Sequence, residues 1–142
     1  MGSMTQDDPD ALEDRDAVIP VLVADDSDVV RRGIRQLLAT QVEIAIVGEA
    51  TNFAQTIQMA TELHPRVIVM DLHMPDEKAI APEELKSGLI NNFQVVAISV
   101  WNDEETKDLA RSLGASALLD KMNLASTLVP TIMRLEHGRA AA

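Results

Sequence analysis

The chain has 142 residues, of which 46% are hydrophobic, and its formal net charge is −11. This length suits one domain with its own core and is too short for two domains of ordinary size. Only 2% of the residues are aromatic, so we expect a core of aliphatic side chains. The acidic balance, without a Lys/Arg cluster, disfavours direct binding to nucleic acid or to an anionic membrane, because both require a basic surface.

Cysteine is absent from the chain, which excludes disulfides and thiolate metal sites. The sequence shows no secretory leader, and no apolar run reaches the roughly 18 residues that a membrane span needs. We therefore expect a soluble, cytoplasmic protein.

The two ends of the chain are expected to lie outside the folded domain. Residues 1–3 resemble an expression scar before a native Met4. The stretch that follows lacks apolar periodicity, so it cannot bury enough surface to offset the entropy of ordering it. Its acids are Asp7, Asp8, Asp10, Glu13, Asp14 and Asp16. We predict an acidic disordered tail over 1–17, one domain over 18–138 and a disordered tail over 139–142.

The first half of the domain alternates between strand and helix patterns. Residues 21–24 are apolar on both faces, as in a central parallel strand, and end at Asp25. Ser27 then caps a helix with one apolar stripe, and a second strand follows at 44–47. Asn52 caps another helix, which ends before Pro65. The inward-facing residues of the two helices are Val30, Ile34, Leu37 and Leu38, then Phe53, Ile57, Ala60 and Leu63.

The second half continues the alternation. A strand at 67–70 runs into Asp71, and Pro82 opens a short helix with acids in its first turn. A strand at 95–98 ends at Ser99, and a helix follows from Asp103 to a closing glycine, Gly114. A fifth strand, 117–119, runs to Lys121. The last helix is predicted to start from a Thr127 cap, which would place Pro130 in the first turn, to turn Leu128, Ile132 and Leu135 inward, and to end at Gly138.

Five such strand–helix units predict an α/β fold in which a doubly wound, five-stranded parallel sheet carries helices on both faces. In such sheets the ligand site lies beyond the carboxyl ends of the strands. The polar residues that follow those ends are Asp25, Asp26, Asp71, Ser99 and Lys121. Three carboxylates at one rim repel one another, and a bound divalent cation would relieve that repulsion. Magnesium suits oxygen ligands of this kind best.

An aspartate can act as a nucleophile toward phosphorus and form an acyl phosphate. The charge on the transferring group then needs a metal, a lysine and hydrogen-bond donors around it. Asp71, the metal, Lys121 and Ser99 could fill these roles.

Four segments resemble the motif blocks of two-component response-regulator receiver domains, in the order and spacing of that family. They are VLVADDS at 21–27, VIVMDLHMP at 67–75, AIS at 97–99 and GASALLDK at 114–121. The resemblance covers residues 18–138 and implies a flavodoxin-like sheet in the strand order 2-1-3-4-5. Details of the last block, together with 128–130, look similar to receivers that precede LuxR-type helix-turn-helix domains. No such domain lies within the 142 residues, so we expect either that the sequence is a piece of a longer protein or that the receiver acts alone.

The resemblance also assigns roles to residues of the rim. Asp71 would be the phosphoacceptor, and Asp26 and Asp71 would bind Mg²⁺ together with the backbone carbonyl of His73, while Asp25 helps partly through water. Lys121 would pair with the phosphoryl group and Ser99 would hydrogen-bond to it. The donor would be a histidine kinase or a phosphotransfer protein. The output face, and a homodimer contact, would be formed by the fourth helix, fifth strand and fifth helix of the family.

Three positions depart from the usual family pattern. Leu118 stands where an aromatic switch residue is common, Met122 replaces the proline that often follows the lysine, and Ala79 replaces a glycine in the loop after Asp71. These departures concern the output mechanism more than the phosphorylation chemistry. Aromatic rotation, in particular, cannot be the readout of this chain.

Three functions therefore remain in competition. The leading one is a signalling domain, not an enzyme, that is phosphorylated and changes its partner. A phosphatase of the haloacid dehalogenase type also uses an aspartyl phosphate and magnesium, but that family expects a second aspartate where this chain has His73. A degenerate receiver that acts as a constitutive interaction domain is disfavoured by the retained acids and Lys121. We further hypothesise that Trp101 and His73 flank the phosphoryl group and limit the access of water.

Overall fold

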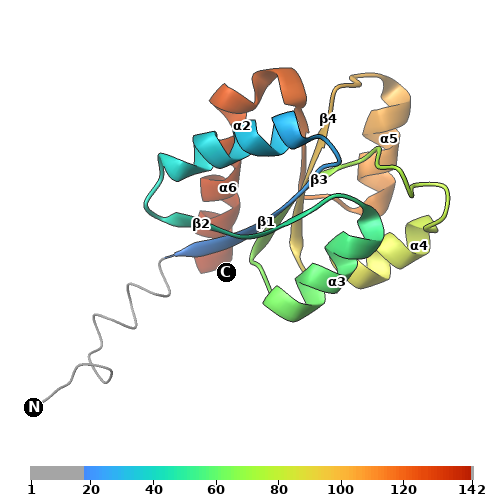
Figure 1. Ribbon diagram of the computed structural model, residues 1–142, viewed down its shortest axis with the longest axis horizontal. Coiled ribbons are helices and arrows are strands. Elements are labelled where there is room, and N and C mark those ends of the chain that lie inside the picture. The colour runs from blue at the N-terminus through green and yellow to red at the C-terminus, as the bar shows by residue number, and fades with distance from the viewer. Residues whose placement is uncertain (1–17, 142) are drawn as a thin grey trace, which may run out of the picture.

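The computed structural model describes residues 18–141, with side chains as far as Gly138. Its five strands form one parallel sheet in the order β2-β1-β3-β4-β5, which confirms the predicted fold and strand order (Figure 1). The strands are β1 (Ile19–Ala24), β2 (Ile44–Ala50), β3 (Val67–Asp71), β4 (Gln94–Ser99) and β5 (Ala117–Asp120). The predicted tail over 1–17 lies outside the described residues.

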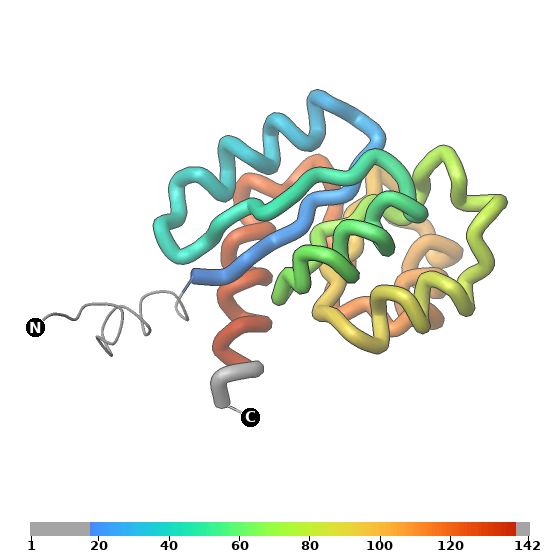
Figure 2. The backbone as a smooth tube through the Cα atoms, turned by 60° about the horizontal axis from the view of Figure 1, so that its bottom comes forward, coloured from blue at the N-terminus to red at the C-terminus, as the bar shows by residue number. Residues whose placement is uncertain are grey.

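Helices cover both faces of the sheet (Figures 1 and 2). One face carries α2 (Asp28–Ala39) and α6 (Leu124–Ala141). The other face carries α3 (Phe53–Leu63), α4 (Pro82–Leu85) with its π-helical continuation η2 (Lys86–Ile90), and α5 (Glu104–Leu113). A short 3₁₀ turn, η3 (Lys121–Asn123), joins β5 to α6. Among the described residues, none of the helices is both long enough and apolar enough to cross a membrane.

The sheet separates two apolar cores, and β1 contributes to both. Val21 and Val23 belong to the cluster beneath α2 and α6. Leu22 and Ala24 belong to the cluster beneath α3, α4 and α5. Successive side chains of a strand point to opposite faces, so a strand covered on both sides must be apolar throughout. This explains why the central strands are continuous apolar runs rather than alternating ones.

Local capping signals place the helices that frame the site. Ser27 accepts a hydrogen bond from Val30 N at 3.2 Å, and Asn52 accepts one from Gln55 N at 2.7 Å. Pro82 stands at the start of α4, as predicted. Gly114 ends α5 in the left-handed conformation, with φ of 83°, which a residue without a Cβ adopts freely. Each of these helix boundaries confirms a prediction from the sequence.

The last helix differs from the prediction at both ends. It begins at Leu124, so Thr127 is not its cap and Pro130 lies inside the helix. The cause is the preceding 3₁₀ turn, which Asp120 caps and which leads directly into helical geometry while burying Leu124. The helix also continues past Gly138 to Ala141, so the expected tail over 139–142 is helical as far as Ala141.

One apolar residue expected in the core lies elsewhere. Leu63, in the last turn of α3, is 40% exposed. It lies over Gly48 of the edge strand β2, where an added Cβ would come within 2.9 Å of Leu63 and 2.7 Å of Met59. Gly48 therefore allows the end of α3 to lie close against the edge of the sheet, and this contact leaves Leu63 partly open to solvent.

Candidate functional site

The carboxyl ends of the strands bring the predicted polar residues to one rim. Asp25 and Asp26 directly follow β1, Asp71 ends β3, and Lys121 directly follows β5. Asp71 pairs in register with Ile98 of β4, and the next residue of β4 is Ser99. Because the strands are parallel neighbours, residues far apart in the sequence meet at this edge.

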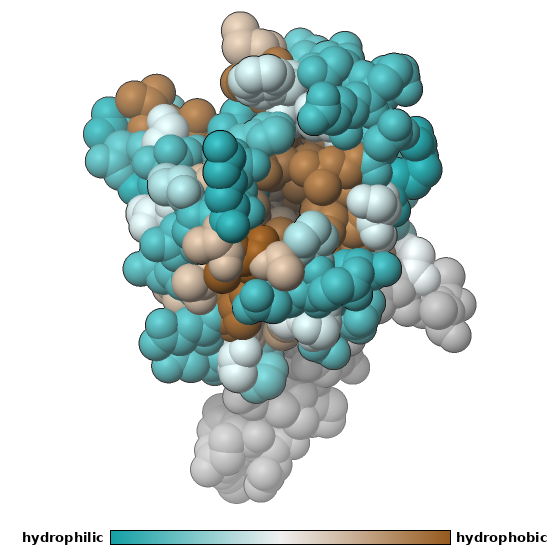
Figure 3. Space-filling model, turned by 90° about the vertical axis from the view of Figure 1, so that its right-hand side faces the viewer, coloured by the Kyte–Doolittle hydropathy of each residue, from teal (hydrophilic) through white to brown (hydrophobic). Residues whose placement is uncertain are grey.

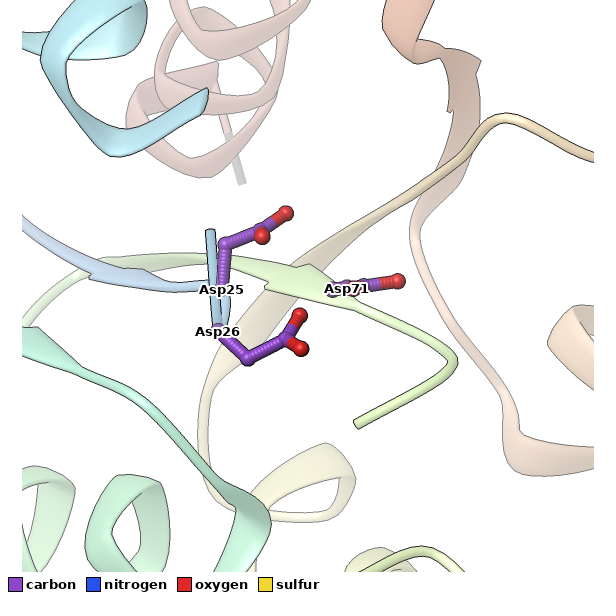
Figure 4. A group of neighbouring side chains, drawn as sticks. All are labelled: Asp25, Asp26 and Asp71. Carbon is purple, nitrogen blue, oxygen red and sulfur yellow. The ribbon is translucent and has the colours of Figure 1, made fainter. Parts of the chain in front are cut away.

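The three carboxylates form one cluster (Figure 4). A carboxylate oxygen from each of Asp25, Asp26 and Asp71 lies within 4.8 Å of the other two. Asp25 is fully buried and Asp71 is 4% exposed, whereas Asp26 is exposed to solvent. The cluster is therefore closed on the side of the core and open through Asp26, as a site for a small cation must be.

Lys121 supplies positive charge to the two buried carboxylates. Its ammonium nitrogen lies 2.7 Å from Oδ2 of Asp25 and 3.1 Å from Oδ2 of Asp71, and its side chain is 11% exposed. One lysine cannot balance three carboxylates, so the cluster keeps net negative charge. Oxygen-only ligands with excess negative charge suit a hard divalent cation.

The pKa values of Asp71 and Lys121 are both raised above their ordinary values. Burial raises the pKa of Asp71, and the charge of Asp25 adds to this effect, although the His73 amide and Lys121 oppose it. Burial lowers the pKa of Lys121, but hydrogen bonding to Asp25 and the charge of Asp71 outweigh it and hold that pKa above its ordinary value. Lys121 therefore stays protonated beside a carboxyl that is costly to ionise.

Backbone amides orient both buried carboxylates. Oδ1 of Asp71 accepts a hydrogen bond from His73 N at 2.9 Å, and Oδ1 of Asp25 accepts one from Ser27 N at 2.8 Å. Each aspartate thus binds the chain two residues further on, which fixes the start of the loop after its strand. In Asp71 this leaves Oδ2 turned toward Lys121.

Ser99, Trp101 and His73 form the neighbouring part of the rim. Ser99 is 1% exposed, and its hydroxyl oxygen accepts a hydrogen bond from Trp101 N at 2.9 Å. The rings of Trp101 and His73 lie 5.6 Å apart between centroids, tilted by 44°. A cavity of about 390 Å³ beside them runs along α5. Polar residues make up most of the lining of this cavity, and Leu109 is among the lining residues. Figure 3 shows this side of the molecule, with apolar residues visible between hydrophilic ones.

Two residues that support the site were missed by sequence reasoning. Arg31 of α2 is buried and donates to the backbone carbonyl of Asp25, to Asp28 and to Glu49. Asp76, in the loop after β3, accepts hydrogen bonds from backbone amides of α3. Arginine on a helix is normally exposed, and an aspartate after proline is typical of a turn. Neither residue therefore carries a sequence signal of its role.

Comparison with known proteins identifies the family. Residues 21–133 match the family model described as the response regulator receiver domain, so the chain belongs to that family. Over 123 residues it is 34% identical to the response regulator protein VraR of Staphylococcus saprophyticus, covering 86% of this chain and 58% of that protein. Over 102 residues it is 34% identical to the nitrate/nitrite response regulator protein NarL of Escherichia coli, covering 71% and 47%.

A solved structure supports the same conclusion. The response regulator domain of CheB from Thermotoga maritima is 26% identical and superposes with a TM-score of 0.72, covering 82% of this chain and 95% of that one. The chain spans about half the length of the curated relatives it matches. The described fold is thus that of a two-component receiver domain, a class whose usual role is signalling.

Proposed function

We propose that this receiver domain accepts a phosphoryl group on Asp71 from a histidine kinase or a phosphotransfer protein, in a Mg²⁺-dependent reaction, and then changes its binding partner. The observation that carries the proposal is the buried pair Asp25 and Asp71, held by one lysine beside the solvent-open Asp26. A purely structural ion pair has no need of a third carboxylate at the same place. The excess negative charge favours uptake of a cation, and the positive charge of the bound cation would then attract an anionic phosphoryl group.

The chemistry assigned to Asp71 is nucleophilic attack on phosphorus. A carboxylate oxygen forms the new P–O bond while the P–N bond of the donor's phosphohistidine breaks, and the imidazole nitrogen keeps that electron pair and takes up a proton. The hydrogen bond from His73 N leaves the second oxygen of Asp71 available on the side of Lys121. Burial removes competing water from the nucleophile.

The neighbouring residues handle the charge of the transferred group. Lys121 would pair with a phosphoryl oxygen. The Ser99 hydroxyl, whose oxygen accepts from the Trp101 amide, would donate its own hydrogen to another phosphoryl oxygen. Asp26, Asp71 and the His73 carbonyl would hold Mg²⁺, with Asp25 assisting through water. The bound ion supplies positive charge to the phosphoryl oxygens during transfer.

The output is expected on the face formed by α5, β5 and α6. Leu118, half-buried in β5, offers no aromatic ring to rotate, so we expect the signal to pass through the loop from Ser99 to α5 instead. A homodimer through this face, a cytoplasmic location and regulation of transcription through an effector domain belong to the same proposal. The domain itself would contact neither nucleic acid nor membrane, and its chemistry would act on its own phosphoryl group alone.

The decisive experiment follows the fluorescence of Trp101 during titration with Mg²⁺ and then beryllofluoride. We expect a saturable response to each ligand in the native chain, and loss of the beryllofluoride response in Asp71→Asn. Asp108→Asn, which changes an exposed acid outside the cluster, is the matched control and should respond like the native chain. If calorimetry shows that the native chain binds neither ligand, a constitutive interaction domain becomes the better description.

A further inference from the structure

A carboxylate outside the acidic cluster joins the loop after β3 to the start of α3. Oδ1 of Asp76 accepts a hydrogen bond from Phe53 N at 2.9 Å, and Oδ2 accepts one from Ala54 N at 3.0 Å. These amides are the first two of α3. A carboxylate is favoured there because the amides have no partner inside the helix and the helix dipole is positive at this end.

The helix caps its remaining first-turn amides from its own side. Gln55 N donates to the side chain of Asn52 at 2.7 Å, and Thr56 N donates to the Asn52 carbonyl at 3.1 Å. Asp76 therefore supplies the acceptors that the local sequence does not provide. The contact therefore links the loop after β3 to the start of α3.

On the loop side, Asp76 also organises the backbone around it. Its carbonyl accepts hydrogen bonds from Ala79 N at 2.9 Å and Ile80 N at 3.2 Å. At the other end of the same short segment, His73 N is bound to Asp71. Pro75 lies between these anchors, and its ring restricts one backbone dihedral further. The segment from His73 to Asp76 is thus fixed at both ends, by Asp71 and by α3.

We infer that Asp76 is a positioning residue for the metal site, because it fixes the backbone from which the His73 carbonyl must reach Mg²⁺. This inference rests on the proposed function. The His73 carbonyl is the one neutral oxygen among the proposed protein ligands. Because it carries no net charge to attract the ion, its binding to Mg²⁺ depends on the position that the loop gives it. Groups that orient a metal ligand from outside contribute measurably to affinity.

The link works in both directions. If the contact between Asp76 and α3 favours metal binding, metal binding must favour that contact by the same factor. We therefore expect Mg²⁺ to slow hydrogen exchange at the amides of Phe53 and Ala54 in the native chain. The amide of Gln55, which Asn52 caps within the helix, provides the internal reference.

The experiment compares Mg²⁺ dissociation constants, measured by Trp101 fluorescence and by calorimetry, for Asp76→Ala, Asp76→Asn and Asn52→Ala. We expect Asp76→Ala to weaken binding about tenfold. Asp76→Asn keeps one acceptor oxygen, so its Mg²⁺ dissociation constant should fall between those of Asp76→Ala and the native chain. Asn52→Ala is the matched control, since it removes a cap from the same helix end without touching the loop, and its affinity should stay at the native value.

The outcomes separate this inference from the proposed function. If the native chain binds Mg²⁺ and Asp76→Ala binds it equally well, Asp76 does not position the site although the function stands. If Asn52→Ala weakens binding as much as Asp76→Ala, general loosening of α3 explains the effect and the inference is wrong. If the native chain does not bind Mg²⁺, both proposals fail. Hydrogen exchange in the native chain keeps the test valid even if Asp76→Ala folds poorly.

Discussion

The ammonium nitrogen of Lys121 lies 3.1 Å from a carboxylate oxygen of Asp71, and both side chains are almost closed to solvent. Asp71 ends β3 and Lys121 directly follows β5, with β4 between them in the sheet. The contact therefore ties the centre of the acidic rim to the start of the 3₁₀ turn η3, which leads into the last helix. Removing either partner should reveal how much of the stability of the domain depends on it.

Loss of the Lys121 side chain should destabilise the domain strongly without Mg²⁺ and less strongly with it. We expect Lys121→Met to lower the free energy of unfolding by roughly 3 kcal/mol in metal-free buffer, because two buried carboxylates lose their counter-ion. Added Mg²⁺ should restore part of the loss. Urea unfolding with chelator and with Mg²⁺ measures both values. Lys107→Met, which breaks an exposed pair with Glu104, should cost less than about 1 kcal/mol and not respond to the metal.

The pH dependence of stability should reveal the raised pKa of Asp71. Because burial raises this pKa in the folded state above its ordinary value of 3.8, the stability gained by protonation is complete below 3.8 and is lost as pH rises through the folded pKa. Asp71→Asn carries no charge, so we expect it to raise the melting temperature at neutral pH in metal-free buffer. The gain should shrink as the pH falls. A gain that is the same at every pH would contradict the assignment.

Arg31 should contribute far more to the stability of the domain than its neighbour Arg35, although both side chains bind Glu49. The side chain of Arg31 is 11% exposed and donates to the Asp25 carbonyl, whereas that of Arg35 is 46% exposed. We expect Arg31→Ala to cost roughly 2 to 3 kcal/mol of unfolding free energy, since it leaves buried acceptors unpaired. Arg35→Ala should cost less than about 1 kcal/mol. Equal losses in urea unfolding would show that Arg31 is not an anchor for Asp25.

Trp101 and His73 are expected to slow hydrolysis of the phosphoryl group by restricting the approach of water. Their rings lie 5.6 Å apart at the rim of the site. Trp101→Ala should therefore dephosphorylate several-fold faster than the native chain, and Trp101→Phe, which keeps a ring, should be close to native. Loss of phosphate from the phosphorylated chain over time gives the rates. An unchanged rate in Trp101→Ala would rule out this role.

Much of the fold could be predicted because its signals are local or periodic. The central strands are apolar on both faces, and the caps Ser27 and Asn52 lie next to the helices that they start. Since parallel strands end at one edge, strand positions alone brought Asp25 and Asp71 together with Lys121. These parts of the site followed from topology.

The remaining parts depend on contacts between distant segments. Burial of Arg31 requires the Asp25 carbonyl and Glu49 beside it, and the role of Asp76 requires the first turn of α3. The helical position of Pro130 follows from the turn that Asp120 caps. The π-helical segment at the end of α4 could not be predicted either. Gly88 lies there against Ile57 of α3, where an added Cβ would approach to 3.3 Å.

The direction of the strands also governs how the molecule can be labelled. β1 starts at the amino edge of the sheet, and α6 returns along it, so both ends of the described chain lie on the same side of the molecule, away from the acids (Figures 1 and 2). A fluorescent protein fused beyond either end would stand clear of the route by which a donor reaches Asp71. Encounters between this domain and its donor could then be followed in living cells without obstructing the chemistry.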